Sequence, residues 1–165
     1  MGKLVPFGPL MSDPRVSPSA PSAAAPYAGD VGPKETWEQL SKDSHAQLID
    51  VRTEAEWNFV GVPDLSSLNR RTLLCEWQRF PPASNPNFAA EVADALNQTG
   101  YRKGSALFFL CRSGARSRAA AIAMTQLGYG PCFNIADGFE GALDQARHRG
   151  SAAGWKAAGL PWIQS

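Results

Sequence analysis

The stretch that decides the fold reads Leu107-Phe108-Phe109-Leu110-Cys111-Arg112-Ser113-Gly114-Ala115-Arg116-Ser117. Its first four residues form an apolar run typical of a buried strand, and the alanine-rich segment that follows predicts a helix over 117–127. The first turn of a helix has unpaired N–H groups and partial positive charge, so arginine is ordinarily disfavoured there. Arginines at 112, 116 and 118 therefore predict an anionic partner, either a bound oxyanion or the thiolate of Cys111.

The cysteine in this loop is a candidate nucleophile. The thiolate is the attacking form, and a free thiol, with a pKa of about 8.5, is mostly protonated at neutral pH. Inward-pointing backbone N–H groups, a helix N-terminus and flanking guanidinium groups would all favour the anion. We therefore expect residues 111–117 to form a small anion-binding loop with a thiolate at neutral pH.

Strands and helices alternate along the rest of the chain. We expect strands at 47–51, 106–110 and 132–135, and helices at 33–41, 54–59, 88–96, 117–127 and 139–147. Thr53-Glu54-Ala55-Glu56 matches a capping box at the start of the second helix. The alternation predicts an α/β fold of three layers, a mostly parallel sheet with helices on both faces. Ligands bind at the carboxyl ends of such strands, where Cys111 falls.

The remaining segments do not follow this pattern. The stretch 66–85 contains Pro81 and Pro82 and lacks periodicity, so we interpret it as an irregular excursion that forms a lid or a pocket wall. Residues 1–28 are rich in proline, serine and alanine and are predicted to be a disordered tail, which leaves one domain over 29–163. A chain of 165 residues has no room for a second catalytic domain.

Charge and composition exclude several classes of partner. The net charge is +1, which gives no global basic field for nucleic acid or an anionic membrane. No apolar run approaches the roughly 20 residues that cross a bilayer. Residues 95–136 nevertheless contain no acidic side chain but five basic ones, Arg102, Lys103, Arg112, Arg116 and Arg118. We therefore expect a local positive potential around Cys111.

The three cysteines at 75, 111 and 132 are too few, and odd in number, for a disulfide framework. They favour a reducing compartment, and we expect a cytoplasmic location. Cys132 lies in an apolar strand and is interpreted as core; Cys75 is interpreted as structural, with resolution of a persulfide as its alternative role. His45 and His148 have no ligand-like spacing, so no metal site is expected.

A family resemblance rests on the same loop. Cys-Arg-x-Gly-x-Arg-Ser after an apolar strand resembles the active loop of the rhodanese superfamily of sulfurtransferases. The segment 48–52 followed by Glu56-Trp57 is similar to the Asp-Val-Arg segment of that domain, and 138–141 with 154–161 resembles its closing segment. The matches run from Gly29 to Trp162, and the chain departs from the pattern at 61–65 and over 66–87.

Resemblance to a single-domain rhodanese implies a two-step cycle. Cys111 takes the outer sulfur of a donor such as thiosulfate, holds it as a persulfide, and passes it to an acceptor such as cyanide or a thiol. This cycle needs no cofactor and no metal. A protein that carries a persulfide is a further class of partner.

Each loop residue has an expected role in that cycle. Gly114 lets the backbone turn its amides inward. Ser113 and Ala115 keep the pocket small, while Arg112 and Arg116 orient the oxygens of the donor. Ser117 either caps the helix or donates to the persulfide. Asp50, at the end of a neighbouring strand, is expected to support the loop as a structural acceptor rather than to act as an acid catalyst.

Three alternatives stay open. A cysteine-dependent phosphatase or arsenate reductase also attacks tetrahedral oxyanions, but four residues separate Cys111 from Arg116, where a phosphatase loop needs five. A non-catalytic rhodanese-like module would use the fold only for docking. A carrier would relay persulfide between proteins by the same chemistry, and the sequence of one chain does not name its partner.

Overall fold

The computed structural model describes residues 25–165. Most of the predicted tail, residues 1–24, lies outside the described residues. Tyr27 and Ala28, the last two residues of the predicted tail, contact the domain. The backbone N–H of Ala28 donates to the carbonyl of Cys132 at 2.8 Å, and the hydroxyl of Tyr27 donates to Asp30 at 2.8 Å.

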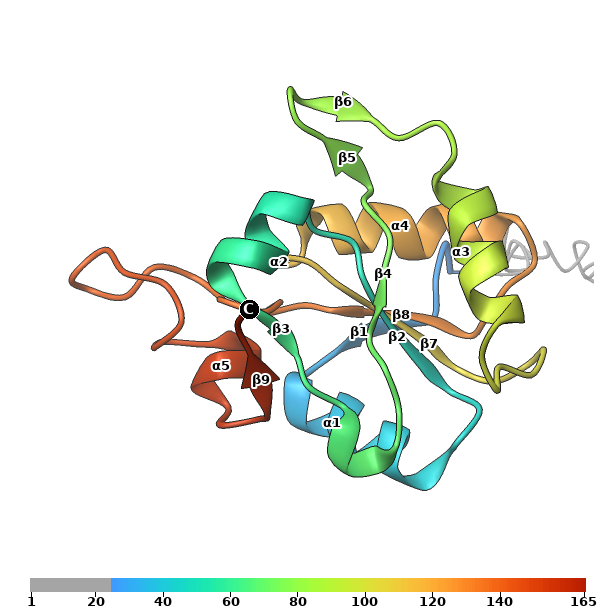
Figure 1. The fold of residues 1–165 in the computed structure, drawn as a ribbon, viewed down its shortest axis with the longest axis horizontal. Coiled ribbons are helices and arrows are strands. Elements are labelled where there is room, and N and C mark those ends of the chain that lie inside the picture. The colour runs from blue at the N-terminus through green and yellow to red at the C-terminus, as the bar shows by residue number, and fades with distance from the viewer. Residues whose placement is uncertain (1–24) are drawn as a thin grey trace, which may run out of the picture.

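Five parallel strands form the central sheet, in the order β1-β8-β7-β2-β4 (Figure 1). Their bounds are β1 Gly29–Val31, β2 Gln47–Asp50, β4 Leu73–Leu74, β7 Leu107–Leu110 and β8 Cys132–Ile135. In the register of β2 and β7, Asp50 pairs with Leu110, so both strands end at the same edge. This edge holds Cys111, as the sequence predicts.

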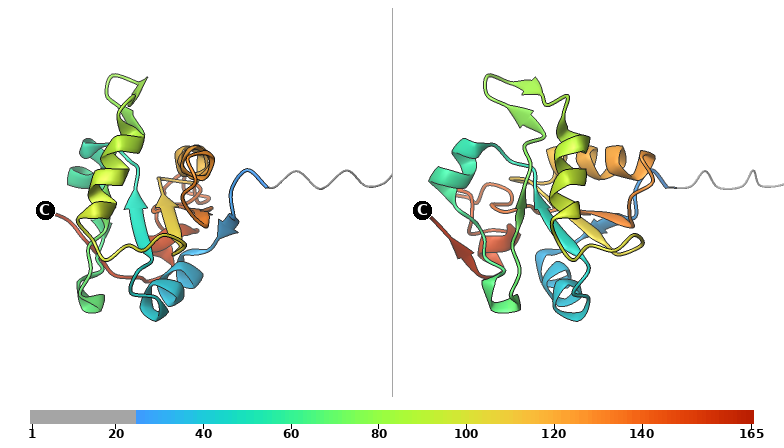
Figure 2. Two further views of the ribbon diagram at one scale, coloured as in Figure 1. Left: turned by 90° about the vertical axis from the view of Figure 1, so that its right-hand side faces the viewer. Right: turned by 45° about the vertical axis from the view of Figure 1, so that its right-hand side comes forward.

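Helices cover both faces of the sheet (Figures 1 and 2). On one face α1 (Pro33–Lys42) and α5 (Gly154–Ala157) pack over Leu48, Phe108 and Leu110. On the other, α3 (Phe88–Asn97) and α4 (Ala115–Gln126) pack over Ile49, Leu107 and Phe109. Alternate residues of β2 and β7 thus enter two separate cores, which explains their unbroken apolar runs. The expected three-layer α/β architecture is confirmed.

Shorter elements complete the domain around the sheet. Helix α2 (Glu54–Val60) begins with the predicted capping box: Thr53 accepts from the N–H of Glu56, and the Glu56 carboxylate accepts from that of Thr53. Strand β3 (Val62–Pro63) pairs antiparallel with β9 (Trp162–Ile163). The excursion 66–85 contains a 3₁₀ turn, η1 (Ser66–Leu68), the edge strand β4, and a projecting hairpin of β5 (Gln78–Arg79) and β6 (Ala83–Ser84).

The helix expected over 139–147 is wrong. The carbonyls of Phe139 and Glu140, which a helix would pair with N–H groups four residues later, accept instead from Lys156 and Gly150, and Gly141 has a left-handed φ of 69°. Further along, both carboxylate oxygens of Asp144 accept hydrogen bonds, one from the N–H of His148 and one from the hydroxyl of Ser151, and this favours a turn. Another boundary also differs, because α4 begins at Ala115 rather than at Ser117.

Candidate active site

Cys111 lies directly after β7 and is 1% exposed. Its Sγ accepts a hydrogen bond from the N–H of Gly114 at 3.1 Å and lies 3.1 Å from the hydroxyl of Ser117. Helix α4 begins at the residue after Gly114, and among residues 25–165 no side chain caps its N-terminus. The sulfur therefore sits beside unpaired N–H groups and the positive end of a helix dipole, which is an environment that favours an anion.

Two glycines allow the backbone of the loop to close. Gly114 has φ 110°, and a Cβ there would clash with the carbonyl of Ala136. Gly138 has φ 65°, and a Cβ there would clash with the carbonyl of Arg112. The loop is thus packed against the segment after β8, to which Phe139 adds a hydrogen bond by donating its N–H to the carbonyl of Cys111 at 2.8 Å. Sequence reasoning identified Gly114 but not the role of Gly138.

Arg116 forms a bidentate ion pair with Glu56. Its two terminal nitrogens donate to the two carboxylate oxygens, each at 2.8 Å, and the side chains are 22% and 21% exposed. Burial alone would raise the pKa of Glu56, but hydrogen bonds from Arg116 and Thr53 outweigh it and lower the pKa to about 2. The hydrogen bonds to Glu56 also raise the pKa of Arg116. Sequence reasoning placed Glu56 in the capping box but did not connect it with the loop.

Asp50 supports the loop only indirectly. It accepts from the backbone N–H of Arg52 at 3.1 Å and from its guanidinium at 2.6 Å, and both side chains are fully buried. Arg52 also donates to the carbonyl of Gly61 at 2.7 Å and stacks 4.2 Å from the ring centre of Phe139. Within the described residues no hydrogen bond joins Asp50 to 111–117, so the structural acceptor expected to support the loop reaches it only through Arg52 and Phe139.

The other predicted loop residues divide between surface and interior. Arg112, Ser113 and Ala115 are exposed, while Ser117 is buried. Because Ser117 lies inside α4, the option that it caps the helix is wrong.

A line of polar contacts runs from Ser117 to the surface. The Ser117 hydroxyl donates to Oδ1 of Asn134 at 2.6 Å, and Nδ2 of Asn134 donates to Asp30 at 3.1 Å. Asp30 also accepts from Tyr27, whose hydroxyl accepts from Nε of Arg118 at 3.3 Å. Sequence reasoning missed Asn134; its signal was a polar residue inside an otherwise apolar buried strand.

The two other cysteines differ from Cys111 in their surroundings. Burial, together with the charge of Glu91, raises the pKa of the Cys75 thiol to about 11. Burial likewise raises the pKa of Cys132, which is partly offset by a hydrogen bond from Thr125. Both are free and buried among apolar side chains, as expected for core cysteines, and this environment disfavours a resolving role for Cys75.

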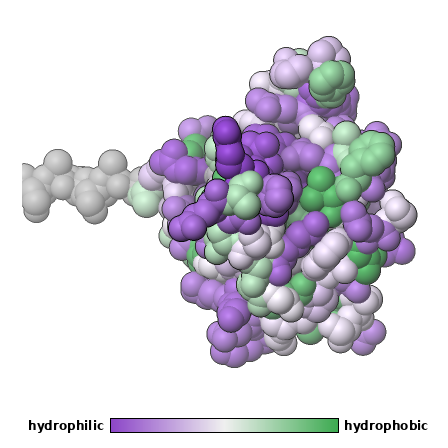
Figure 3. All heavy atoms as spheres, turned by 90° about the vertical axis from the view of Figure 1, so that its left-hand side faces the viewer, coloured by the Kyte–Doolittle hydropathy of each residue, from purple (hydrophilic) through white to green (hydrophobic). Residues whose placement is uncertain are grey.

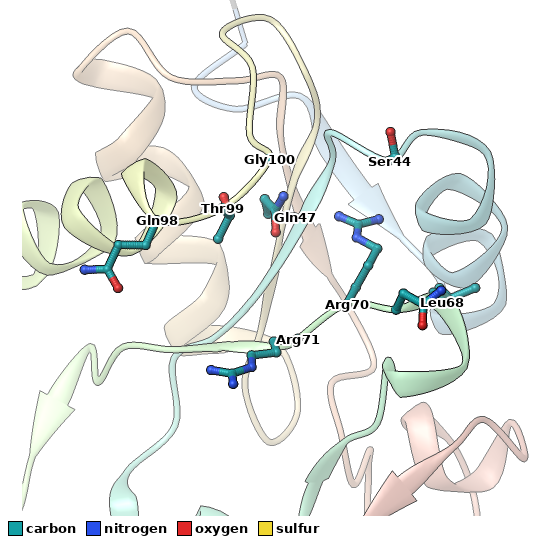
Figure 4. A pocket seen from close by; sticks show the side chains of 9 residues that line it. Ser44, Gln47, Leu68, Arg70, Arg71, Gln98, Thr99 and Gly100 are labelled. Atoms are coloured by element: carbon teal, nitrogen blue, oxygen red, sulfur yellow. The ribbon is translucent and has the colours of Figure 1, made fainter.

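A cavity of about 530 Å³ lies at the opposite edge of the sheet (Figure 4). Its lining includes Arg70, Arg71 and Gln47, the first residue of β2. Arg70 already donates to the carbonyls of Leu40 and Asp43, and its guanidinium does not point toward that of Arg71. Cys111 follows the other end of the parallel strands, so this cavity is separate from the candidate site.

The surface near α2 and β9 mixes polar and apolar side chains (Figure 3). Phe59 and Phe80 are more than 80% exposed, and Phe80 lies in the turn of the projecting hairpin, between β5 and β6. Over 25–165, no three His, Cys, Asp or Glu side chains gather in a way that could bind a metal ion. None of the helices in that range is long and apolar enough to cross a membrane.

These features define an α/β protein with a buried cysteine in the loop that precedes α4, at the carboxyl edge of a parallel sheet. A family model described as "STR4 middle domain" matches residues 29–165, and the chain belongs to this family. Among its relatives, the protein RC0915 of Rickettsia conorii is 38% identical over 128 residues, which are 78% of this chain and 91% of that protein.

Two further relatives bear on fold and function. The chloroplastic rhodanese-like domain-containing protein 4 of Arabidopsis thaliana is 25% identical over 132 residues, 79% of this chain and 25% of that protein. The crystal structure of Rv0390 from M. tuberculosis has a TM-score of 0.76 and 50% identity, and the match covers 84% of this chain and 99% of that one. The expected relation to rhodaneses is thus supported at the level of a distant, rhodanese-like relative.

Proposed function

We propose that this protein is a sulfurtransferase that moves a sulfane sulfur through a persulfide on Cys111. The observation that carries the proposal is the hydrogen bond from the N–H of Gly114 to Sγ of Cys111, at the uncapped N-terminus of α4. This environment favours both a thiolate and the terminal sulfur of a persulfide, which also carries negative charge.

The cycle has two displacements. The Cys111 thiolate attacks the outer sulfur of thiosulfate, the S–S bond of the donor breaks, and sulfite leaves with the electron pair. Cyanide or a thiolate then attacks the outer sulfur of the persulfide, the new S–S bond breaks, and the Cys111 thiolate is restored. The two steps neither take up nor release a proton, and they use no metal and no cofactor.

The surrounding residues have defined roles in this proposal. Arg116, whose two terminal nitrogens donate to Glu56, forms a fixed ion pair beside the loop, and the exposed Arg112 and Ser113 are the residues that we propose bind the oxygens of the donor. Cys111 is only 1% exposed, which favours a small anion over a bulky donor. Ala115, the first residue of α4, is exposed and adds no charge of its own.

Steady-state kinetics test the proposal. With thiosulfate and cyanide varied together, thiocyanate release should follow parallel double-reciprocal lines, the pattern of a ping-pong mechanism. Cys111→Ser should abolish release, and Cys132→Ala, as a matched cysteine control, should retain it. Equal rates in wild type and Cys111→Ser would refute the proposal. Release of phosphate from an aryl phosphate by the wild type would favour the phosphatase alternative instead.

A further inference from the structure

A cleft of about 430 Å³ lies between α2 and the projecting hairpin of β5 and β6. Phe59, near the end of α2, and Phe80, in the turn of the hairpin, both line it and are 81% and 86% exposed. Single exposed apolar residues are common on proteins, but two aromatic rings on one concave surface are typical of a binding site. The cleft is therefore a candidate docking surface.

The base of the hairpin is fixed to the domain, whereas its turn projects away from it (Figures 1 and 2). Asn85, 6% exposed, donates to the carbonyl of Glu76 at 2.9 Å and to the carboxylate of Glu91 at 3.0 Å. Arg79 donates to the same carboxylate at 2.7 Å. Because these contacts order the hairpin before a partner arrives, binding there costs less conformational entropy than the ordering of a free loop.

The charge around the cleft is negative. Its charged lining residues are Glu54, Glu76 and Arg79. Arg79 is already paired, since its Nη2 lies 2.7 Å from the carboxylate of Glu91. One oxygen of Glu76 accepts from the N–H of Glu54 at 3.1 Å, and the other lies 3.9 Å from Arg79. The exposed side chain of Glu54 has no hydrogen bond or ion pair with another residue of 25–165, so this surface favours a positively charged ligand.

The cleft lies on the side of α2 that faces away from Arg116. Asn58 and Phe59 line the cleft, whereas Glu56, on the other side of the helix, binds Arg116. A helix is about 10 Å wide, a distance that about three extended residues span. A chain bound in the cleft can therefore carry a thiol, a few residues further on, to the edge of the sheet that holds Cys111.

We infer that this cleft docks the protein that accepts sulfur from Cys111, through an extended segment in which a lysine or arginine lies next to an apolar side chain. The apolar side chain packs against Phe59 and Phe80, and the cation binds Glu54. The inference rests on the proposed function: the partner's thiolate attacks the outer sulfur of the persulfide and becomes a persulfide itself, and the Cys111 thiolate leaves.

A second copy of this chain is a poorer occupant of the cleft. A two-fold contact brings the same surface of both copies together, so Glu54 and Glu76 would face their own counterparts across the interface. Like charges placed opposite each other oppose association. The negative charge of the cleft therefore favours a different protein with a basic segment.

Selection from a phage-displayed library of random peptides, with the full chain as bait, tests recognition apart from sulfur transfer. We expect enrichment of lysine or arginine beside an apolar residue. The double variant Phe59→Ser/Phe80→Ser should bind the selected peptide about tenfold more weakly or worse, while Leu127→Ser, a control at a residue that is 59% exposed, should bind it normally. Glu54→Lys should weaken this peptide and strengthen its analogue with glutamate at the basic position, a pair of opposite effects that loss of structure alone would not give.

Sulfur transfer provides the second readout. The selected peptide, extended by a cysteine about three residues away, should accept sulfur from the wild type with a higher kcat/KM than from Phe59→Ser/Phe80→Ser. Both proteins should release thiocyanate from cyanide at the same rate, because a small acceptor does not use the cleft.

Three results would overturn the inference: no enriched peptide, enriched peptides that bind the double phenylalanine variant equally well, or a dimer of the full chain in sedimentation that Phe80→Ser abolishes. Peptide binding without any thiocyanate release from the wild type would instead place the failure in the proposed function and not in the docking surface.

Discussion

Arg116 and Glu56 join the first turns of α4 and α2 through two parallel hydrogen bonds of 2.8 Å each. Glu56 also closes the capping box with Thr53, so one carboxylate fixes the start of α2 and the arginine that follows the Cys111 loop. The guanidinium of Arg116 is therefore held in place by a residue of α2 that lies 60 positions away in the sequence.

Glu56→Gln should destabilise the protein at neutral pH. The lowering of the Glu56 pKa from 4.5 to about 2 means that the carboxylate stabilises the folded state above pH 4.5, and that this stability is lost as the pH falls toward about 2. Because both side chains are partly exposed, solvent screens the ion pair between Glu56 and Arg116. We therefore expect the substitution to lower the free energy of unfolding by about 1–2 kcal/mol. Urea unfolding at pH 7 and pH 3 measures the difference, which should be smaller at the lower pH. The exposed Glu38→Gln is the control, and an equal effect from both variants would contradict the account.

Gly114→Ala should cost more than about 2 kcal/mol of unfolding free energy, because a positive φ and a clash with the Ala136 carbonyl add together. Gly104→Ala is the matched control, since Gly104 has φ 93° and a Cβ there would meet no atom within 4 Å, and it should cost about 1 kcal/mol. Denaturant unfolding of both variants separates backbone strain from close packing. Equal losses would show that the contact with Ala136 is unimportant.

The buried ion pair between Arg52 and Asp50 should contribute to the free energy of unfolding. Arg52→Leu leaves the Asp50 carboxylate buried without its partner and should cost about 3–5 kcal/mol. The double variant Asp50→Leu/Arg52→Leu should recover part of this loss, because neither charge is then buried alone. A double-mutant cycle by chemical denaturation measures the coupling, and strictly additive losses would argue against it.

Although all three cysteines are buried, Cys75 and Cys132 should be far less reactive than Cys111. Brief treatment with iodoacetamide near pH 7.5 should label Cys111 first, since burial raises the pKa of Cys75 to about 11 and also raises that of Cys132. In urea all three cysteines should react alike. Peptide mapping by mass spectrometry gives the order, and preferential labelling of native Cys75 would contradict the assignment.

The sequence predicted those elements whose local residue pattern is enough to specify the structure that they adopt in the fold. The apolar runs of β2 and β7 and the capping box of α2 are of this kind, because each signal lies within a few residues. The helix expected over 139–147 does not form because the carbonyls of Phe139 and Glu140 accept from the N–H groups of Lys156 and Gly150, further along the chain. A single sequence carries no local signal for that pairing.

The same limit applied within the site. Cys111 and Gly114 could be identified because the loop is contiguous in the sequence. The partners Glu56 and Asn134 come from other elements, and only the fold brings them to the loop. Asp50 was placed at the correct edge, but its adjacent arginine, Arg52, was not recognised as the residue that it binds.

The most direct test of the central claim is intact-protein mass spectrometry after incubation with thiosulfate, on wild type and Cys111→Ser. The account predicts that the wild type gains the mass of one sulfur atom, that cyanide removes it with release of thiocyanate, and that the variant gains nothing. A wild-type protein that acquires no sulfur under these conditions, or a Cys111→Ser variant that acquires it equally, would contradict a thiosulfate-derived persulfide on Cys111.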